Sequence, residues 1–241
     1  MDAAGVFSSG APAEWSPRFA VIGARPGAVG VHGEEDGELA FAFAAGAALL
    51  AELWGEQDLD DSMILVVLYL LRHALELGLK RVVGTLARSL EFELREGQDP
   101  PVDLAKMNKD LAATHRLDVL ARHLTRMAAL FGFEVQGEVE AVCEMFAAVD
   151  PDGQWLRYSE VRVKTPGQGS VLAAARQAPV YVDVPQLLER AGTACAALDV
   201  LLGQVEELQD GQLWFGPDYA WREFAASLRE ESRAGRGDGP V

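Results

Sequence analysis

The stretch "MILVVLYLLRHALELGLKR", residues 63–81, decides the fold, because it begins as an unbroken apolar run and then gains polar residues at helical spacing. At 100° per residue, two faces of a helix can be separated. One face carries only leucines: Leu68, Leu71, Leu75 and Leu79. The other face carries Tyr69, His73, Glu76 and Lys80. The leucine face predicts a helix that packs in a core.

The polar face allows two interpretations. If it reaches solvent, Glu76 and Lys80 form an i, i+4 ion pair worth about 0.2–0.5 kcal/mol. Residues 63–68 are apolar on all sides, however, which favours a central helix. In a central helix, His73 and Glu76 need polar partners, because an unpaired buried charge costs too much free energy.

Outward from this segment, the sequence predicts further helices. Asp60, Asp61 and Ser62 offer N-caps for a helix that runs to about Leu94. The other predicted helices cover about 38–54, 115–132, 136–150, 184–209 and 218–231, with one short strand at 161–164. In the helix at 115–132, the expected core residues recur at spacings of three and four: Leu117, Leu120, Leu124, Met127 and Leu130. The chain is therefore predicted to be mainly α, an up-and-down helical bundle of four to five long helices with a small irregular or β N-terminal addition.

This pattern also predicts the domain organisation. Residues 1–14 are expected to form a flexible arm, 15–37 the small irregular or β segment, 38–231 the bundle and 232–241 a disordered tail. The N-terminus has no basic, apolar leader, and the apolar run that starts at Met63 stops at Arg72, short of the roughly 20 residues that span a bilayer. We therefore expect a cytoplasmic protein without a membrane partner.

Charge and cysteine content limit the functions. The formal net charge of −16 over 241 residues disfavours broad binding to nucleic acid, so any RNA or nucleotide site must be a local basic groove. Cys143 and Cys195 lie in apolar helical segments without CxxC spacing, which predicts reduced, buried thiols and not a zinc site.

The segment "THRLDVLARH", residues 114–123, holds two pairs with possible chemistry. His115 and Asp118 repeat the spacing of His73 and Glu76, and facing helices with such pairs can hold metals. The additional glutamates of a di-metal site are missing, so we predict no metal and no cofactor. Arg116 and His123 lie seven residues apart on one stripe, where an arginine steadies a phosphate and a histidine acts as general acid or base.

Three motifs together resemble a bacterial group related to HEPN domains, the higher-eukaryote and prokaryote nucleotide-binding helical bundles. The motifs are "YLLRHALELGLK", "THRLDVLARHL" and "DPDGQWLRYSE", followed by "YVDVPQLLERAGTACAALDVLL". The resemblance covers about residues 60–208. It marks Arg72, His73, Glu76 and Lys80 in the first motif, His115, Leu117 and Leu120 in the second, and Arg157 and Tyr158 in the third.

The resemblance implies a four- to five-helix bundle, often dimeric, in a family whose active members are metal-independent ribonucleases of toxins and antiviral defence systems. Their pattern, Arg, four to six residues, then His, fits Arg116 to His123. Leu117 departs from it, because active members commonly have a polar residue there. A second candidate cluster consists of Arg72, His73, Glu76, His115 and Arg157.

Two functions are therefore expected. As an endoribonuclease, the protein would use His123 or His115 as general base, and Arg116, Arg72 or Arg157 would stabilise the phosphate. Lys80, Arg157 and Tyr158 would contribute to binding. As a non-catalytic module, it would bind a nucleotide or a protein partner, and the same residues would form a structural network. In both cases we expect a homodimer or a subunit of a larger assembly.

Overall fold

A computed structural model describes residues 36–57, 60–94, 99–157, 160–165, 169–174 and 181–215. Within these ranges the chain is mainly helical and forms a helical bundle, which confirms the predicted fold class. The described helices are α1 (Asp36–Gln57), α2 (Ser62–Glu93), α3 (Leu104–Ala113), α4 (Leu117–Phe131), α5 (Gly137–Val149) and α6 (Val184–Phe215). Strands β1 (Glu160–Thr165) and β2 (Gly169–Ala174) pair antiparallel.

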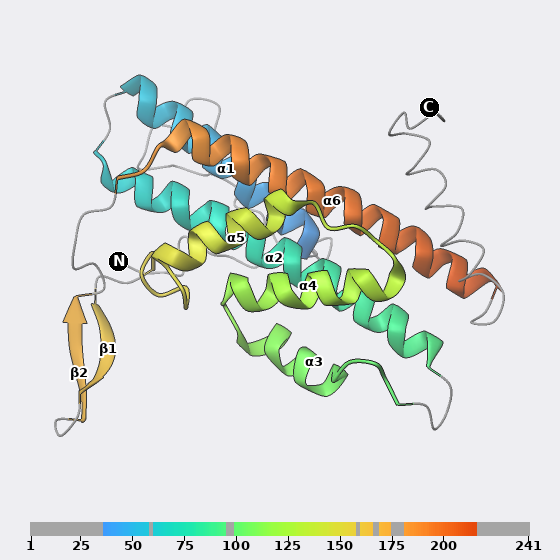
Figure 1. Ribbon diagram of the computed structural model, residues 1–241. Coiled ribbons are helices and arrows are strands. Elements are labelled where there is room, and N and C mark those ends of the chain that lie inside the picture. The colour runs from blue at the N-terminus through green and yellow to red at the C-terminus, as the bar shows by residue number, and fades with distance from the viewer. Residues whose placement is uncertain are drawn as a thin grey trace, which may run out of the picture. The chain divides into compact units, whose positions relative to one another are not determined.

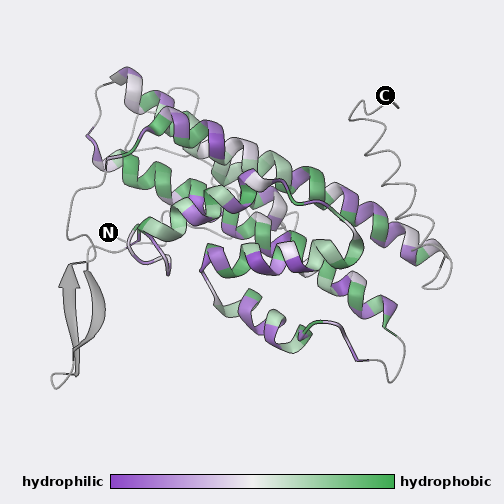
Figure 2. Ribbon diagram, viewed as in Figure 1, coloured by the Kyte–Doolittle hydropathy of each residue, from purple (hydrophilic) through white to green (hydrophobic). Residues whose placement is uncertain are grey.

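Helix α2 is the central element of the bundle, and it packs against α1, α3, α4 and α6 (Figure 1). Helix α5 packs against α4 and α6. The predicted leucine face of α2 is buried throughout, together with Leu120 and Leu124 of α4 and Leu198 of α6. Figure 2 shows that the first turns of α2 are almost continuously hydrophobic and that hydrophilic residues appear farther along the helix. A central position accounts for this pattern, because the start of α2 has apolar neighbours on several sides.

Several element boundaries differ from the prediction. Helix α3 was not predicted, although Asp103 caps it by accepting a hydrogen bond from the Lys106 backbone N–H at 2.9 Å. Helix α1 continues through Gly55, and α6 extends to Phe215, beyond the predicted end at residue 209. A second strand, β2, pairs with the expected one. Leu130 is 37% exposed, and the neighbouring Phe131 takes the core position instead.

Other predictions fall on residues 1–35, 216–241 and Tyr158, which lie outside the described residues. Two of the described helical segments, Asp36–Glu56 and Ser62–Glu93, are long and apolar enough by composition to cross a bilayer. The second is the central helix of the bundle, and core helices generally meet the same criterion, so this finding is weak support for a membrane span.

Candidate functional site

Polar residues from three parts of the chain meet beside the middle of α2. We call this group the Glu76 cluster: Arg72, Glu76 and Lys80 on α2, His115 between α3 and α4, Asp150 at the end of α5, and Arg157 shortly after it. The second candidate set from the sequence is thus largely brought together. His73 lies beside it but makes different contacts, and Asp150 was not predicted.

Arg72 is the buried centre of the cluster, with a side chain that is only 1% exposed. Its Nη1 atom donates to Oε2 of Glu76 at 3.2 Å, and its Nε lies 3.0 Å from Oδ2 of Asp150 as an ion pair. Its Nη2 donates to the backbone carbonyl of His115. One guanidinium therefore ties α2 to the α3–α4 linker and to the end of α5, as the planar fork of arginine permits.

Glu76 receives contacts on both carboxylate oxygens, and its side chain is 2% exposed. Oε1 accepts a hydrogen bond from Nζ of Lys80 at 2.9 Å and lies 2.8 Å from Nδ1 of His115. Oε2 faces Arg72 and, at 3.6 Å, Nη2 of Arg157. Burial raises the pKa of Glu76, but the hydrogen bonds from Lys80 and His115 outweigh it, so the pKa is lowered. Glu76 is therefore ionised at neutral pH.

His115 is the exposed end of this network. Its side chain is 46% exposed, although the carboxylate that it contacts is buried. With Nδ1 held by Glu76, an Nδ1–H tautomer donates to the carboxylate and leaves Nε2 with a free lone pair. The geometry is that of an imidazole oriented by a carboxylate, the arrangement that general bases use in several enzyme classes.

The turn after α5 is shaped to receive Arg72. Asp150 Oδ1 accepts from the Trp155 backbone N–H at 2.8 Å, while its other oxygen faces Arg72. Gly153 has a φ of 77°, and a Cβ there would lie 2.9 Å from Nη2 of Arg72. The sequence indicated a turn at Asp150, but the partner of this acid is 78 residues earlier. A buried arginine in need of an acid was the only available signal.

His73 lies in an aromatic stack beside the cluster. Its ring is 4.6 Å from Phe43 of α1 in an edge contact and 5.6 Å from Tyr69 in a stacked one. Arg157 lies 5.6 Å from the centre of the Tyr69 ring. Burial is the largest cause that lowers the pKa of His73, and its buried Nδ1 has no hydrogen-bond partner among the described residues. His73 is therefore a neutral packing residue between α1 and α2.

Arg116 and His123 do not contact each other. Arg116 donates from Nε and Nη2 to Asp118 at 3.1 and 2.9 Å. His123 Nε2 lies 3.0 Å from Oδ2 of Asp110 on α3. Asp118 is thus paired with Arg116 and Arg122, whereas His115 contacts Glu76. The side chains of the formal ribonuclease motif each have an acidic partner of their own.

The remaining sequence expectations concern thiols and metals. Cys143 is buried and Cys195 half-buried, and burial raises their pKa values to about 12 and about 11. Among the described residues, no three His, Cys, Asp or Glu side chains form a group that would hold a metal ion.

No protein-family model, curated protein or solved structure matches this chain.

Proposed function

We propose that this protein is a HEPN-like helical bundle that cleaves RNA, with His115 as general base. The observation that carries the proposal is the 2.8 Å contact between His115 Nδ1 and the buried carboxylate of Glu76, combined with the 46% exposure of the imidazole. A network that served only to join helices would not need a half-exposed histidine. A general base needs both an orienting partner and access to substrate.

The chemistry is a transesterification within the RNA strand. His115 Nε2 takes the proton of a ribose 2′-hydroxyl, and the 2′-oxygen attacks the adjacent phosphorus. The bond to the 5′-oxygen breaks, and that oxygen takes a proton from water, which leaves a 2′,3′-cyclic phosphate and a 5′-hydroxyl. Lys80 and Arg157 lie on the same carboxylate as His115, with side chains 17% and 22% exposed. They would stabilise the charge that develops on the phosphate.

Local charge supports an anionic substrate despite the acidic total. The Glu76 cluster contains three cationic side chains, those of Arg72, Lys80 and Arg157, against the two carboxylates of Glu76 and Asp150. The chain as a whole has a net charge of −16. The cluster is therefore a positive spot on an acidic protein, and phosphate would be drawn to it locally.

The test is cleavage of a 3′-fluorescent single-stranded RNA by the purified protein, with EDTA present. We expect His115→Ala to reduce the rate by about 10²-fold or more, as loss of a general base does. His123→Ala is the matched control, because the polar contact of His123 is with Asp110 and not with the Glu76 cluster, and the variant should retain the wild-type rate within about twofold. Equal loss in both variants, or no cleavage by the wild-type protein, would contradict the proposal.

A second candidate is the non-catalytic module, and the burial of the cluster supports it. The side chains of Arg72, Glu76 and Asp150 are at most 2% exposed, and together they join three parts of the chain. Such a network fixes the positions of helices whether or not chemistry occurs at its edge. This candidate predicts intact RNA with the wild-type protein and a large loss of stability on removal of Glu76.

We also propose that the protein is cytoplasmic and belongs to a toxin or antiviral defence system. It would act as a homodimer or as a subunit of a larger assembly. Apolar side chains exposed on α1, Phe41 at 77% and Leu49 at 62%, support association through that helix. Light scattering after size exclusion, with Phe41→Ser as the variant, measures the mass directly. A monomeric wild-type protein would contradict self-association.

A further inference from the structure

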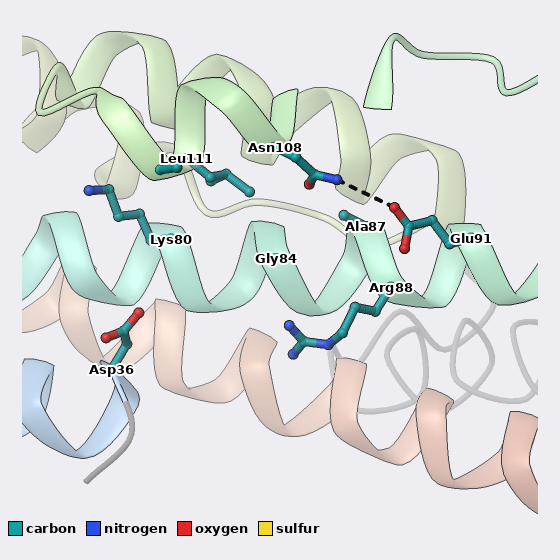
Figure 3. A pocket seen from close by; sticks show the side chains of 9 residues that line it. Asp36, Lys80, Gly84, Ala87, Arg88, Glu91, Asn108 and Leu111 are labelled. Carbon is teal, nitrogen blue, oxygen red and sulfur yellow. Dashed lines mark hydrogen bonds between the residues drawn. The ribbon is translucent and has the colours of Figure 1, made fainter. Parts of the chain in front are cut away.

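A groove lies along α2 where α3 packs against it, with a volume of about 350 Å³ (Figure 3). Gly84 and Ala87 of α2 form its floor, and Asn108 and Leu111 of α3 line one side. Lys80 stands at one end and Glu91 at the other, and the side chain of Arg88 extends from α2 on the side away from α3. Its volume is in the range of pockets that hold small organic molecules, and one nucleotide is of that size.

The groove shares Lys80 with the Glu76 cluster. Asn108 Nδ2 donates to Oε1 of Glu91 at 3.4 Å, and farther along the chain His115 Nδ1 lies 2.8 Å from Oε1 of Glu76. Since residue numbers rise along α3 while those of its partners on α2 fall, the two helices run antiparallel, and the chain after α3 leads to His115. Lys80 belongs to both places, since it lines the groove and its Nζ donates to Glu76. A ligand in the groove would therefore have one end beside the imidazole.

The surface of the groove combines small apolar residues with two cationic side chains. Lys80, Gly84 and Arg88 are spaced by four residues and share one stripe of α2. A Cβ at Gly84 would meet only Nη1 of Arg88, at 3.8 Å, so the glycine leaves open space between the two cations. Arg88 donates to the Thr85 hydroxyl at 3.0 Å and forms no ion pair with an acid among the described residues. Its charge is thus available to a phosphate.

Two acids also line the groove and restrict where phosphate can lie. Glu91 accepts the amide of Asn108, and Asp36 stands on the α1 side. Phosphates are therefore expected at Lys80 and Arg88, and the base and sugar over Gly84 and Ala87, where an apolar surface suits them.

We infer that the α2–α3 groove holds the nucleotide next to the scissile phosphate of a single-stranded RNA. This inference rests on the proposed function, because it uses His115 as the point of cleavage. It adds a binding site outside the Glu76 cluster, and it makes Gly84 and Arg88 determinants of substrate binding.

The test is binding of a fluorescent five-nucleotide RNA whose riboses are 2′-O-methylated, so that it cannot be cleaved. Gly84→Leu fills the groove and should raise the Kd at least about tenfold, because the leucine side chain occupies the space of the bound nucleotide. Gly203→Leu on α6 is the matched control, since no atom lies within 4 Å of a Cβ there, and it should bind as the wild-type protein does. Equal Kd values for Gly84→Leu and the wild-type protein would overturn the inference.

Arg88→Ala gives a second, independent readout. It should lower the slope of log Kd against log salt by about one, the effect of one lost phosphate contact. Arg126→Ala removes an exposed arginine of α4 and should leave the slope unchanged. If RNA binding is unchanged in Gly84→Leu and Arg88→Ala while cleavage still requires His115, the inference about the groove is overturned and the proposed function is not. Absence of both binding and cleavage in the wild-type protein overturns both.

Discussion

The Nε atom of Arg72 lies 3.0 Å from Oδ2 of Asp150, and these two side chains are 1% and 0% exposed. The contact joins the central helix to the residue that ends α5. Because both charges are almost completely removed from water, each depends on the other for compensation. The position of the turn that follows α5 is therefore coupled to the middle of α2.

Asp150→Ala should destabilise the protein by about 3–5 kcal/mol, because it leaves the guanidinium of Arg72 buried with one acid fewer. Urea denaturation at neutral pH gives the free energy of unfolding. Asp118→Ala is the matched control, since Asp118 pairs with the exposed Arg116 and Arg122, and such pairs contribute at most about 1 kcal/mol. Similar losses of unfolding free energy in both variants would show that the buried pair stabilises the protein no more than the exposed pairs do.

Gly153→Ala should also destabilise the protein. Its φ of 77° costs a residue with a Cβ about 1–2 kcal/mol. The added Cβ would also lie 2.9 Å from a guanidinium nitrogen that cannot move without losing its contacts. Gly192→Ala in α6 has nothing within 4 Å and should stabilise its helix by about 0.5–1 kcal/mol. Thermal unfolding of the two variants should therefore shift in opposite directions, and a shared direction would contradict this account of Gly153.

The leucine and polar faces of α2 were predictable from the sequence, because helical periodicity is a local property. The partners of Glu76 were harder to predict. Lys80 follows from i, i+4 spacing. His115 is 39 residues away, and the sequence offered it as a candidate partner on a facing helix without indicating which of its atoms would meet Glu76.

The Arg116–His123 pair shows a limit of spacing as evidence. Its spacing satisfied a motif, yet Asp118 and Asp110 take the two side chains. Spacing along one helix places side chains on one face but does not show which neighbours compete for them. Asp150 was missed for the same reason, since only the tertiary fold brings it to Arg72.

His73 should make stability depend on pH in the mildly acidic range. Burial lowers its pKa below the ordinary 6.5, while Glu76 acts in the opposite direction and Arg157, Lys80 and Arg72 add to the lowering. Below pH 6.5 the unfolded chain therefore binds more protons than the folded one, so this contribution to stability falls as pH falls. His73→Phe keeps the ring contacts and removes the titration. Its unfolding free energy should decline less than that of the wild-type protein between pH 7 and 5, and parallel curves would exclude the effect.

Glu76→Gln should slow RNA cleavage by between about 10²- and 10⁴-fold, since an amide does not orient or stabilise a protonated His115 as a carboxylate does. The variant should also lose about 3–5 kcal/mol of stability, because Arg72 and Lys80 lose a buried counter-charge. Its activity should therefore be measured at a temperature where circular dichroism shows the folded state.

The double variant Glu76→Gln/His115→Ala separates positioning from folding. If Glu76 acts through His115, Glu76→Gln should have no further effect on cleavage once the imidazole is gone, because residues that act as a unit are not additive. A stability defect alone would lower activity in both backgrounds equally.

The pH dependence of unfolding adds a second readout. The lowered pKa of Glu76 contributes stability that is complete above pH 4.5 and is lost as pH falls through the folded-state pKa. Glu76→Gln should remove that acid-dependent loss, whereas His115→Ala should only reduce it, since Lys80 still donates to the carboxylate. If Glu76→Gln lost stability in acid as the wild-type protein does, Glu76 would not be the ionised, hydrogen-bonded partner of His115 that the proposal requires.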